Sequence, residues 1–202
     1  MARTKSSQGA GVTSERILDV AEVLAQTRGF NGFSYADIAA EIGITKASLH
    51  YHFPTKASLG AALVGRYREN FQAALAKIAA LNEPGIEKLR LYAGVYGQVL
   101  GADRMCLCGM FAAEFSTLPE PIQGELRQFF DENETWLVRV LEEGRRDGSL
   151  RFEGSAADTA GLLTGALEGS MLLARSYRDN ARFIAPVGKL IQVLAVGNEA
   201  SR

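Results

Sequence analysis

The sequence predicts an all-α protein of about nine helices, and three observations support this fold class. Apolar residues recur at the three- and four-residue spacing of amphipathic helices through most of the chain. From Ile86 to Arg202 we find no strand-like alternation and no internal repeat. The interruptions contain glycine, proline or Asp-Gly and Asp-Asn pairs, which end helices. We therefore expect one small helical domain followed by a larger one.

Length and composition limit the classes of protein that remain. The 202 residues are 47% hydrophobic, which suffices for two helical domains around a buried core. The net charge of -1 offers no general attraction to nucleic acid, so any DNA affinity must come from locally placed cations. The chain lacks the apolar start of a signal peptide, and no uncharged run approaches the ~18 residues of a membrane helix. We expect a cytoplasmic protein with no membrane segment.

Residues 1–12 predict a flexible arm, because they are polar, contain glycine and show no periodicity. Arg3 and Lys5 are the only charges of this arm, and such arms can enter a minor groove, although a disordered tail is the simpler interpretation. The first helix is expected to start at Thr13 or Ser14, after which apolar residues recur at helical spacing until Gly29 ends it.

The stretch from Ser34 to Leu59 predicts two short helices joined by a tight turn. Ser34 can cap the first helix, with Asp37 as a short version of the capping-box acid, and Gly43 ends it. Thr45 can cap a second helix, which Pro54 prevents from continuing. This is the spacing of a helix-turn-helix, and we expect a DNA-binding domain over residues 13–58.

The second short helix has one apolar side and one polar, donor-rich side. Lys46 and Ser48 on the polar side can meet base edges in a major groove. Tyr51, His52 and Lys56 are placed to hold phosphates. A plain solvated helix face is the alternative interpretation of the same pattern.

These residues resemble the TetR-type transcriptional repressors. The family pattern is a first helix ending in Gly-Phe, followed later by Ser/Thr-Leu-Tyr-x-His-Phe-x-x-Lys-x-x-Leu. Gly29-Phe30 and the stretch from Ser48 to Leu59 match this pattern, and the resemblance covers roughly Thr13 to Leu63. One position differs, since His50 replaces the usual tyrosine, and its imidazole can donate to a phosphate.

The resemblance implies a regulator, not an enzyme, that binds a double-stranded inverted-repeat operator as a homodimer and is released by a small-molecule inducer. Repression is preferred over activation, although both remain open at this point. No cofactor and no metal are expected. The predicted DNA-binding residues are Ser34, Tyr35, Thr45, Lys46, Ser48, His50, Tyr51, His52 and Lys56.

Residues 59–202 predict a helical domain for ligand binding and dimerisation. Thr55 can cap a long helix whose apolar stripe runs from Leu59 to Ile78, as a connecting rod or simply as a packing helix. A turn with a short extended piece is expected over residues 147–152. The five further helices are Ile86 to Gly101, Arg104 to Ser116, Pro121 to Arg146, Ala156 to Tyr177 and Arg182 to Val196.

Two of these helices are apolar on more than one face. Thr159 to Ala174 is small and apolar nearly all round, and the last helix also has more than one apolar face. Such helices need cover, and two from each protomer would form a four-helix interface about a two-fold axis. We expect dimerisation through Gly161 to Arg175 and Leu190 to Val196.

The second domain also carries the candidate ligand site. Aromatic residues together with Gly94, Gly97, Gly109, Gly165 and Gly169 predict space for a small, mainly apolar ligand. Glu168, the lone charge of its apolar helix, needs a partner, and can be its polar anchor or part of an internal ion pair. The predicted ligand-binding residues are Tyr92, Tyr96, Cys106, Met110, Phe111, Trp136, Glu168 and Met171.

The two cysteines leave a second function open. Cys106 and Cys108 are two residues apart, so a helix would place them on different faces and they cannot easily share one metal ion. They are either buried core residues or the sensors of a regulator that responds to oxidants or electrophiles. An enzyme with a cysteine nucleophile is disfavoured, because both histidines lie in the first domain.

Overall fold

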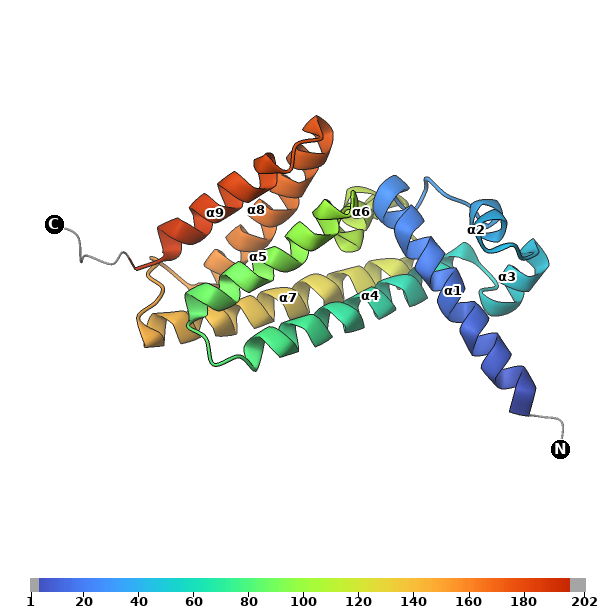
Figure 1. Ribbon diagram of the computed structural model, residues 1–202, viewed down its shortest axis with the longest axis horizontal. Helices are drawn as coiled ribbons and strands as arrows, with labels where there is room; N and C mark the ends of the chain where they lie inside the picture. The colour runs from blue at the N-terminus through green and yellow to red at the C-terminus, as the bar shows by residue number, and fades with distance from the viewer. Residues whose placement is uncertain (1–3, 197–202) are drawn as a thin grey trace. The chain divides into compact units, whose positions relative to one another are not determined.

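The computed structural model describes residues 4–196, with side chains from residue 14 onward. Within that range the chain is all-α, which confirms the predicted fold class (Figure 1). No helix of the described range is long and apolar enough to cross a membrane. The elements are α1 (Thr4–Arg28), α2 (Tyr35–Ile42), α3 (Lys46–His52), α4 (Lys56–Ala79), α5 (Gly85–Gly101), α6 (Leu107–Ala113), the 3-10 helix η1 (Phe115–Thr117), α7 (Glu120–Asp147), α8 (Ala156–Tyr177) and α9 (Ala181–Leu194).

Two predicted helix starts are wrong. Helix α1 begins at Thr4 and not at Thr13 or Ser14, so it includes residues 4–12 of the predicted arm, while Arg3 lies outside the described residues. Extending a helix that already exists is much easier than starting one, which explains why a weakly helical segment joins α1. Helix α6 begins at Leu107 and not at Arg104, and residues 104–106 before it are not helical.

The chain divides into two compact units, and the division differs from the predicted boundary after residue 58. The first unit contains Met1–Arg68 and Leu107–Gln128, and the second contains Glu69–Cys106 and Phe129–Arg202. Helix α6 belongs to the first unit because Phe111 packs edge-on against Phe30, with ring centroids 5.4 Å apart. Ile122 of α7 also fills the space beside Gly60, where a Cβ atom would collide with it.

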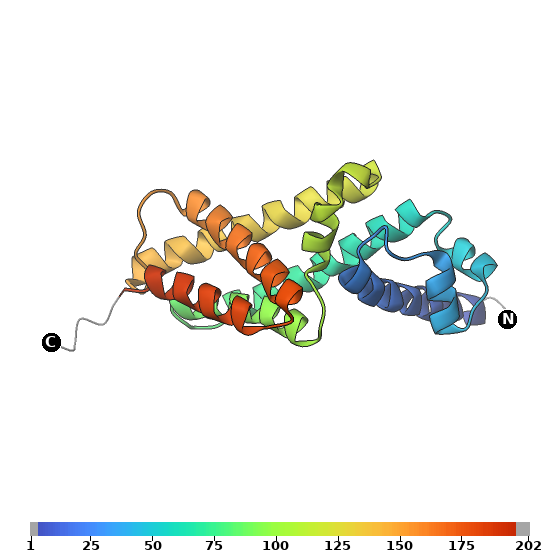
Figure 2. The ribbon, with the colours of Figure 1, turned by 90° about the horizontal axis from the view of Figure 1, so that it is seen from above.

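The second unit has a core of aromatic residues. The Trp136 ring on α7 stacks on Tyr92 of α5, with centroids 5.4 Å apart, and its indole donates to the carbonyl of Leu75 at 3.2 Å. Phe71 of α4 lies edge-on to both Tyr92 and Tyr96. Helices α8 and α9 lie side by side in both views (Figures 1 and 2).

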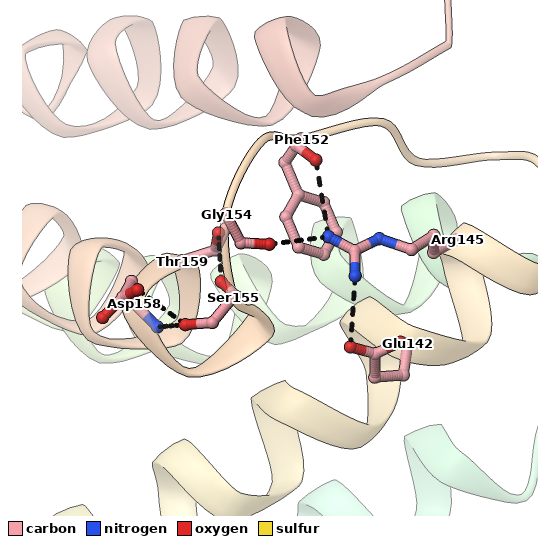
Figure 3. Close-up of polar contacts among 7 residues, drawn as sticks. All are labelled: Glu142, Arg145, Phe152, Gly154, Ser155, Asp158 and Thr159. Carbon is pink, nitrogen blue, oxygen red and sulfur yellow. Dashed lines mark hydrogen bonds and ion pairs between the residues drawn. The ribbon is translucent and has the colours of Figure 1, made fainter.

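Hydrogen bonds from Arg145 and the Ser155 cap of α8 hold the connection between α7 and α8 in place (Figure 3). The Arg145 guanidinium donates to the carbonyls of Phe152 and Gly154, at 3.4 and 3.1 Å, and covers the Phe152 ring. Ser155 caps α8 by accepting the Asp158 N–H at 3.0 Å. Leu150 forms an antiparallel bridge with Ala195, which confirms the short extended piece predicted in this region.

Candidate nucleic-acid interface and a buried polar cluster

Local side-chain caps build the helix-turn-helix as the sequence predicts. The Asp37 carboxylate accepts from the Ser34 hydroxyl at 2.6 Å and from its N–H at 2.7 Å, and these bonds lower the pKa of Asp37. Gly43 ends α2 with φ 77. The Thr45 hydroxyl accepts the Ser48 N–H at 3.1 Å and so starts α3. Each device acts over no more than a few residues.

Helix α3 turns its polar side to solvent. Leu49 is fully buried and Phe53, just after the helix, is 8% exposed, so these residues anchor α3 in the first unit. Thr45, Lys46 and His50 are exposed, and the Tyr51 side chain is 79% exposed. Ser48 and His52 are half-buried. An exposed helix with short donors and one cation is suited to a major groove.

A shallow hollow of about 330 Å³ brings five of the predicted DNA-binding residues together, namely Ser34, Tyr35, Lys46, His50 and Lys56. The Tyr35 hydroxyl donates to the carbonyl of Phe53 at 2.7 Å, and burial raises the pKa of Tyr35 to about 12. The Tyr35 hydroxyl therefore serves mainly to hold the end of α3 in position. The His50 ring lies 4.7 Å from the Tyr35 ring, and its Nδ1 is 3.1 Å from the Pro54 carbonyl oxygen.

Lys56 has partners that the sequence did not suggest. Its ammonium donates to the carbonyls of Phe30 and Phe33, at 2.6 and 2.5 Å. It also lies 4.5 and 4.6 Å from the centroids of the same two rings. Desolvation lowers the pKa of Lys56. These contacts make Lys56 a brace of the loop between α1 and α2, whereas its predicted phosphate contact stays a prediction.

We expect Lys56→Met to lower the free energy of unfolding by about 1 to 3 kcal/mol, because two partly buried carbonyls lose a charged donor. Chemical denaturation measures this loss. The salt dependence of duplex binding then separates the two roles. A phosphate contact would make the log-log salt slope shallower by about one unit, whereas a purely structural lysine would leave it unchanged.

Glu114, just after α6, is a contact of the first unit that sequence reasoning missed. Its carboxylate accepts the Phe30 N–H at 2.6 Å and the Asn31 N–H at 3.3 Å. The Asn31 amide in turn donates to the Thr117 hydroxyl at 2.8 Å. Gly29, with φ 80, has no side chain that would collide with the Glu114 carboxylate. A Cβ atom at this position would lie only 2.8 Å from Oε1 of Glu114. No local signal in the sequence connects residues this far apart.

Four of the eight predicted ligand-binding residues gather in the second unit, where they join Asn133 in a buried polar cluster, defined here as Tyr92, Tyr96, Cys106, Asn133 and Glu168. The Asn133 amide donates to the Tyr96 hydroxyl at 3.0 Å, and the hydroxyls of Tyr92 and Tyr96 are 3.3 Å apart. The Cys106 sulfur and the Glu168 carboxyl are hydrogen-bonded to each other. Burial, together with Cys106, raises the pKa of Glu168 well above its ordinary value.

The other predicted ligand-binding residues are placed differently. Trp136 and Met171 are buried in the second unit, whereas Met110 and Phe111 belong to α6 in the first unit. Asn133 is fully buried and was not predicted, because it lies within the polar run from Asp131 to Thr135, where the sequence gives no signal that one residue is buried. Its membership in the cluster depends on the packing of α5 against α7.

Several of the predicted glycines of the second unit border open space. Gly94 and Gly97 line an open groove of about 330 Å³ between α5 and α9. A Cβ atom at Gly165 or Gly169 would meet nothing within 4 Å, and Gly165 is exposed on α8. Tyr92 and Tyr96 are each only 1% exposed. A larger side chain at Gly165 would therefore extend into open space, and the predicted ligand space beside the aromatic residues stays a prediction.

Both cysteines are buried, Cys106 in the second unit and Cys108 in the first. Among the described residues, no group of three or more histidine, cysteine, aspartate or glutamate side chains is placed to hold a metal ion. Reactive thiols are usually at least partly exposed, and neither sulfur has that exposure.

Two family models match the chain in the same order as the two predicted domains. Residues 17–63 match the bacterial regulatory proteins of the tetR family. Residues 85–184 match the tetracyclin repressor-like C-terminal domain.

Individual relatives agree with these matches. A TetR-family transcriptional regulator from Agrobacterium tumefaciens is 33% identical, with a TM-score of 0.90 over 93% of this chain and 100% of its own. A TetR regulator from Legionella pneumophila is 34% identical, with a TM-score of 0.81 over 96% of this chain and 98% of its own. The HTH-type transcriptional regulator LmrA of Bacillus subtilis is 26% identical, covering 84% of this chain and 90% of its own.

A fourth relative has a different name. The nucleoid occlusion factor SlmA of Photobacterium profundum is 26% identical, covering 84% of this chain and 86% of its own. The family models, the identities and the exposed polar face of α3 lead to one conclusion: the chain belongs to the TetR family of helix-turn-helix, DNA-binding transcriptional regulators, which are not enzymes.

Proposed function

We propose that this protein is a repressor that binds an inverted-repeat operator as a homodimer and leaves it when a small molecule binds in the second unit. The observation that carries the proposal is the capped α3, in which Lys46 is exposed to solvent while Leu49 is buried and anchors the helix. A protein that only occupies an operator needs nothing beyond this DNA reader and a means of release. We therefore favour repression over activation.

The exposed apolar residues of α8 and α9 support a dimer. Leu162, Leu172 and Leu173 of α8 are between 48% and 58% exposed. Ile184 and Val193 of α9 are 67% and 64% exposed. Large apolar side chains gathered on two adjacent helices favour self-association, and a two-fold dimer presents its two α3 helices to a symmetric site.

Some apolar residues within the predicted interface ranges are buried in the protomer and cannot test the dimer. Leu163 is 1% exposed and Leu194 is 6% exposed, so both lie within the core of the protomer. A charge at either position would unfold the protomer and would not test the dimer. Leu173 and Ile184 are the appropriate positions.

Thr45, Lys46 and Ser48 are proposed to contact base edges, with Tyr51 and His52 on phosphates. Lys46→Ala should change the preferred site in a selection from random duplexes, by about 1 to 3 kcal/mol at the base it contacts. Lys77→Ala is the control, because it removes an exposed lysine from the last turn of α4, in the second unit. Unchanged affinity and preference after Lys46→Ala would show that another face reads the DNA.

Release needs a path from the second unit to the first. Helix α4 begins in the first unit and ends in the second, so it is one path. The segment Leu107–Gln128 is another, because it follows Cys106 directly and holds the α1–α2 loop through Glu114. A ligand that binds the non-operator form about a hundredfold better would shift the equilibrium by roughly 2.7 kcal/mol. Screening small molecules for release of the selected duplex tests this part.

The thiol-responsive alternative, with Cys106 and Cys108 as sensors, stays a prediction. Burial of both sulfurs and the carboxyl beside Cys106 weigh against it, since reactive thiolates need access and positive surroundings. Loss of duplex binding on mild oxidation, reversed by reductant and absent in Cys→Ser variants, would favour it.

A further inference from the structure

We infer that the ligand of the second unit is a small aromatic amine, bound as a cation with its N–H groups on the oxygens of Glu168 and Asn133. This inference rests on the proposed ligand-responsive repressor and names the chemical class of its ligand. Three features of the buried polar cluster support this inference: hydrogen-bond acceptors without donors, a carboxyl group without a positively charged partner, and surrounding aromatic rings.

Two oxygens of the cluster lack donors. Oε1 of Glu168 and Oδ1 of Asn133 are buried and accept no hydrogen bond from the described part of the chain. A buried acceptor without a donor costs about 1 to 3 kcal/mol in proteins, so such atoms mark a place where a donor binds. An ammonium group offers three N–H donors and can reach more than one acceptor.

The charge of the site also favours a cation. Glu168 interacts electrostatically with three titratable groups, Cys106, Tyr92 and Tyr96. None of them carries a positive charge in either protonation state. No lysine or arginine of the described chain offsets the desolvation of the Glu168 carboxyl. A carboxylate would repel an anionic ligand here, whereas an ammonium ion would give it the missing partner.

The aromatic residues around the cluster suit the remainder of such a ligand. Tyr92 stacks with Trp136, and the Phe71 ring lies edge-on to Tyr92 and Tyr96. Rings of this kind attract cations through their faces and pack against other rings. Since Tyr92 and Tyr96 are 1% exposed, a small ligand is favoured because it demands little rearrangement of the core.

Binding is coupled to a proton. Burial raises the pKa of the Glu168 carboxyl, so in the free protein this carboxyl keeps its proton to a higher pH than an exposed glutamate does. When the ammonium ion binds, the carboxyl proton leaves to solvent and the carboxylate pairs with the cation, with no covalent bond formed or broken. The affinity should therefore fall about tenfold for each pH unit below the pKa of Glu168 in the free protein.

The test is calorimetric titration of the full chain with three probes of one shape. These are 2-phenylethylamine, the neutral 2-phenylethanol and trimethyl(2-phenylethyl)ammonium, which keeps the charge but lacks N–H donors. We expect the amine to bind at least about tenfold more tightly than either analogue. A loss of this size is typical when a ligand lacks one ion pair or one hydrogen bond that the site can make. Titrations at several pH values in buffers of different ionisation enthalpy should show that proton release on binding grows as the pH falls toward the pKa of Glu168.

Equal affinity for the amine and the alcohol would overturn the inference, and equal affinity for the quaternary ion would overturn its N–H contacts. The probe comparison in the parent protein does not depend on any variant folding. Glu168→Gln should lose both the preference for the amine and the proton release. Glu153→Gln, which neutralises an exposed carboxylate, should behave like the parent.

Duplex binding measured in parallel separates this inference from the proposed function. A parent protein that selects no duplex overturns the repressor, whatever the amine does. A protein that binds its duplex but shows no preference for the amine overturns only the ligand class. Amine binding that leaves duplex affinity unchanged overturns its role as the releasing ligand.

Discussion

A charge at Leu173 or Ile184 is expected to separate the proposed dimer into monomers and to weaken operator binding by at least about a hundredfold. The two side chains are 54% and 67% exposed in the protomer, so a glutamate there does not disturb the protomer core. In a dimer the same carboxylate would be buried without a partner, which costs several kcal/mol. Each monomer would then bind a half-site without the gain from its linked partner.

Light scattering coupled to size-exclusion chromatography measures the oligomeric state, and titration of the selected duplex measures the operator affinity. Leu91→Glu is the matched control, because Leu91 is a 42% exposed leucine on α5, away from α8 and α9 in the sequence. This control should remain dimeric and bind normally. A Leu173→Glu protein that does the same would exclude this surface as the interface.

Glu114→Ala is expected to lower the free energy of unfolding by about 2 to 3 kcal/mol and to weaken duplex binding. The substitution removes the carboxylate that accepts the N–H groups of Phe30 and Asn31, and it leaves the partly buried Phe30 donor without that acceptor. The α1–α2 loop also receives the Lys56 ammonium, so loosening it should disturb the placement of α2 and α3.

Urea unfolding and duplex titration provide the measurements for Glu114. Glu114→Gln retains one acceptor oxygen and should lose less than the alanine variant. Glu120→Ala is the control, because Glu120 is 77% exposed and makes a 3.6 Å ion pair with Arg127 that should contribute little. If Glu114→Ala is as stable as this control, the carboxylate does not hold the α1–α2 loop.

The DNA reader could be predicted from the sequence because its determinants are local. Ser34 with Asp37, Gly43 and Thr45 act on backbone groups no more than a few residues away, and the structure contains the corresponding caps. Helix α8 was predicted with its observed bounds, because its start and end both carry local signals. The family motif added the expected function, since several of its polar residues have no role in a core.

Tertiary packing alone decided which side chains remain available for function. Tyr35 and Lys56 are polar residues of the reader, yet their donors are engaged by carbonyls at residues 30, 33 and 53. Leu163 and Leu162 are neighbours of the same type, but one is 1% and the other 58% exposed. A pattern that is apolar all round cannot distinguish the core face from the open face.

The contacts of Glu114 and those within the buried polar cluster also could not be predicted from the sequence. Glu114 meets Phe30 across 84 positions of the chain, and the cluster joins residues from α5, α7 and α8 and the turn before α6. Caps and periodicity encode where a helix starts, ends and has an apolar face. Which polar groups meet after those helices pack depends on their relative rotation and depth, and no local signal in this chain specifies these.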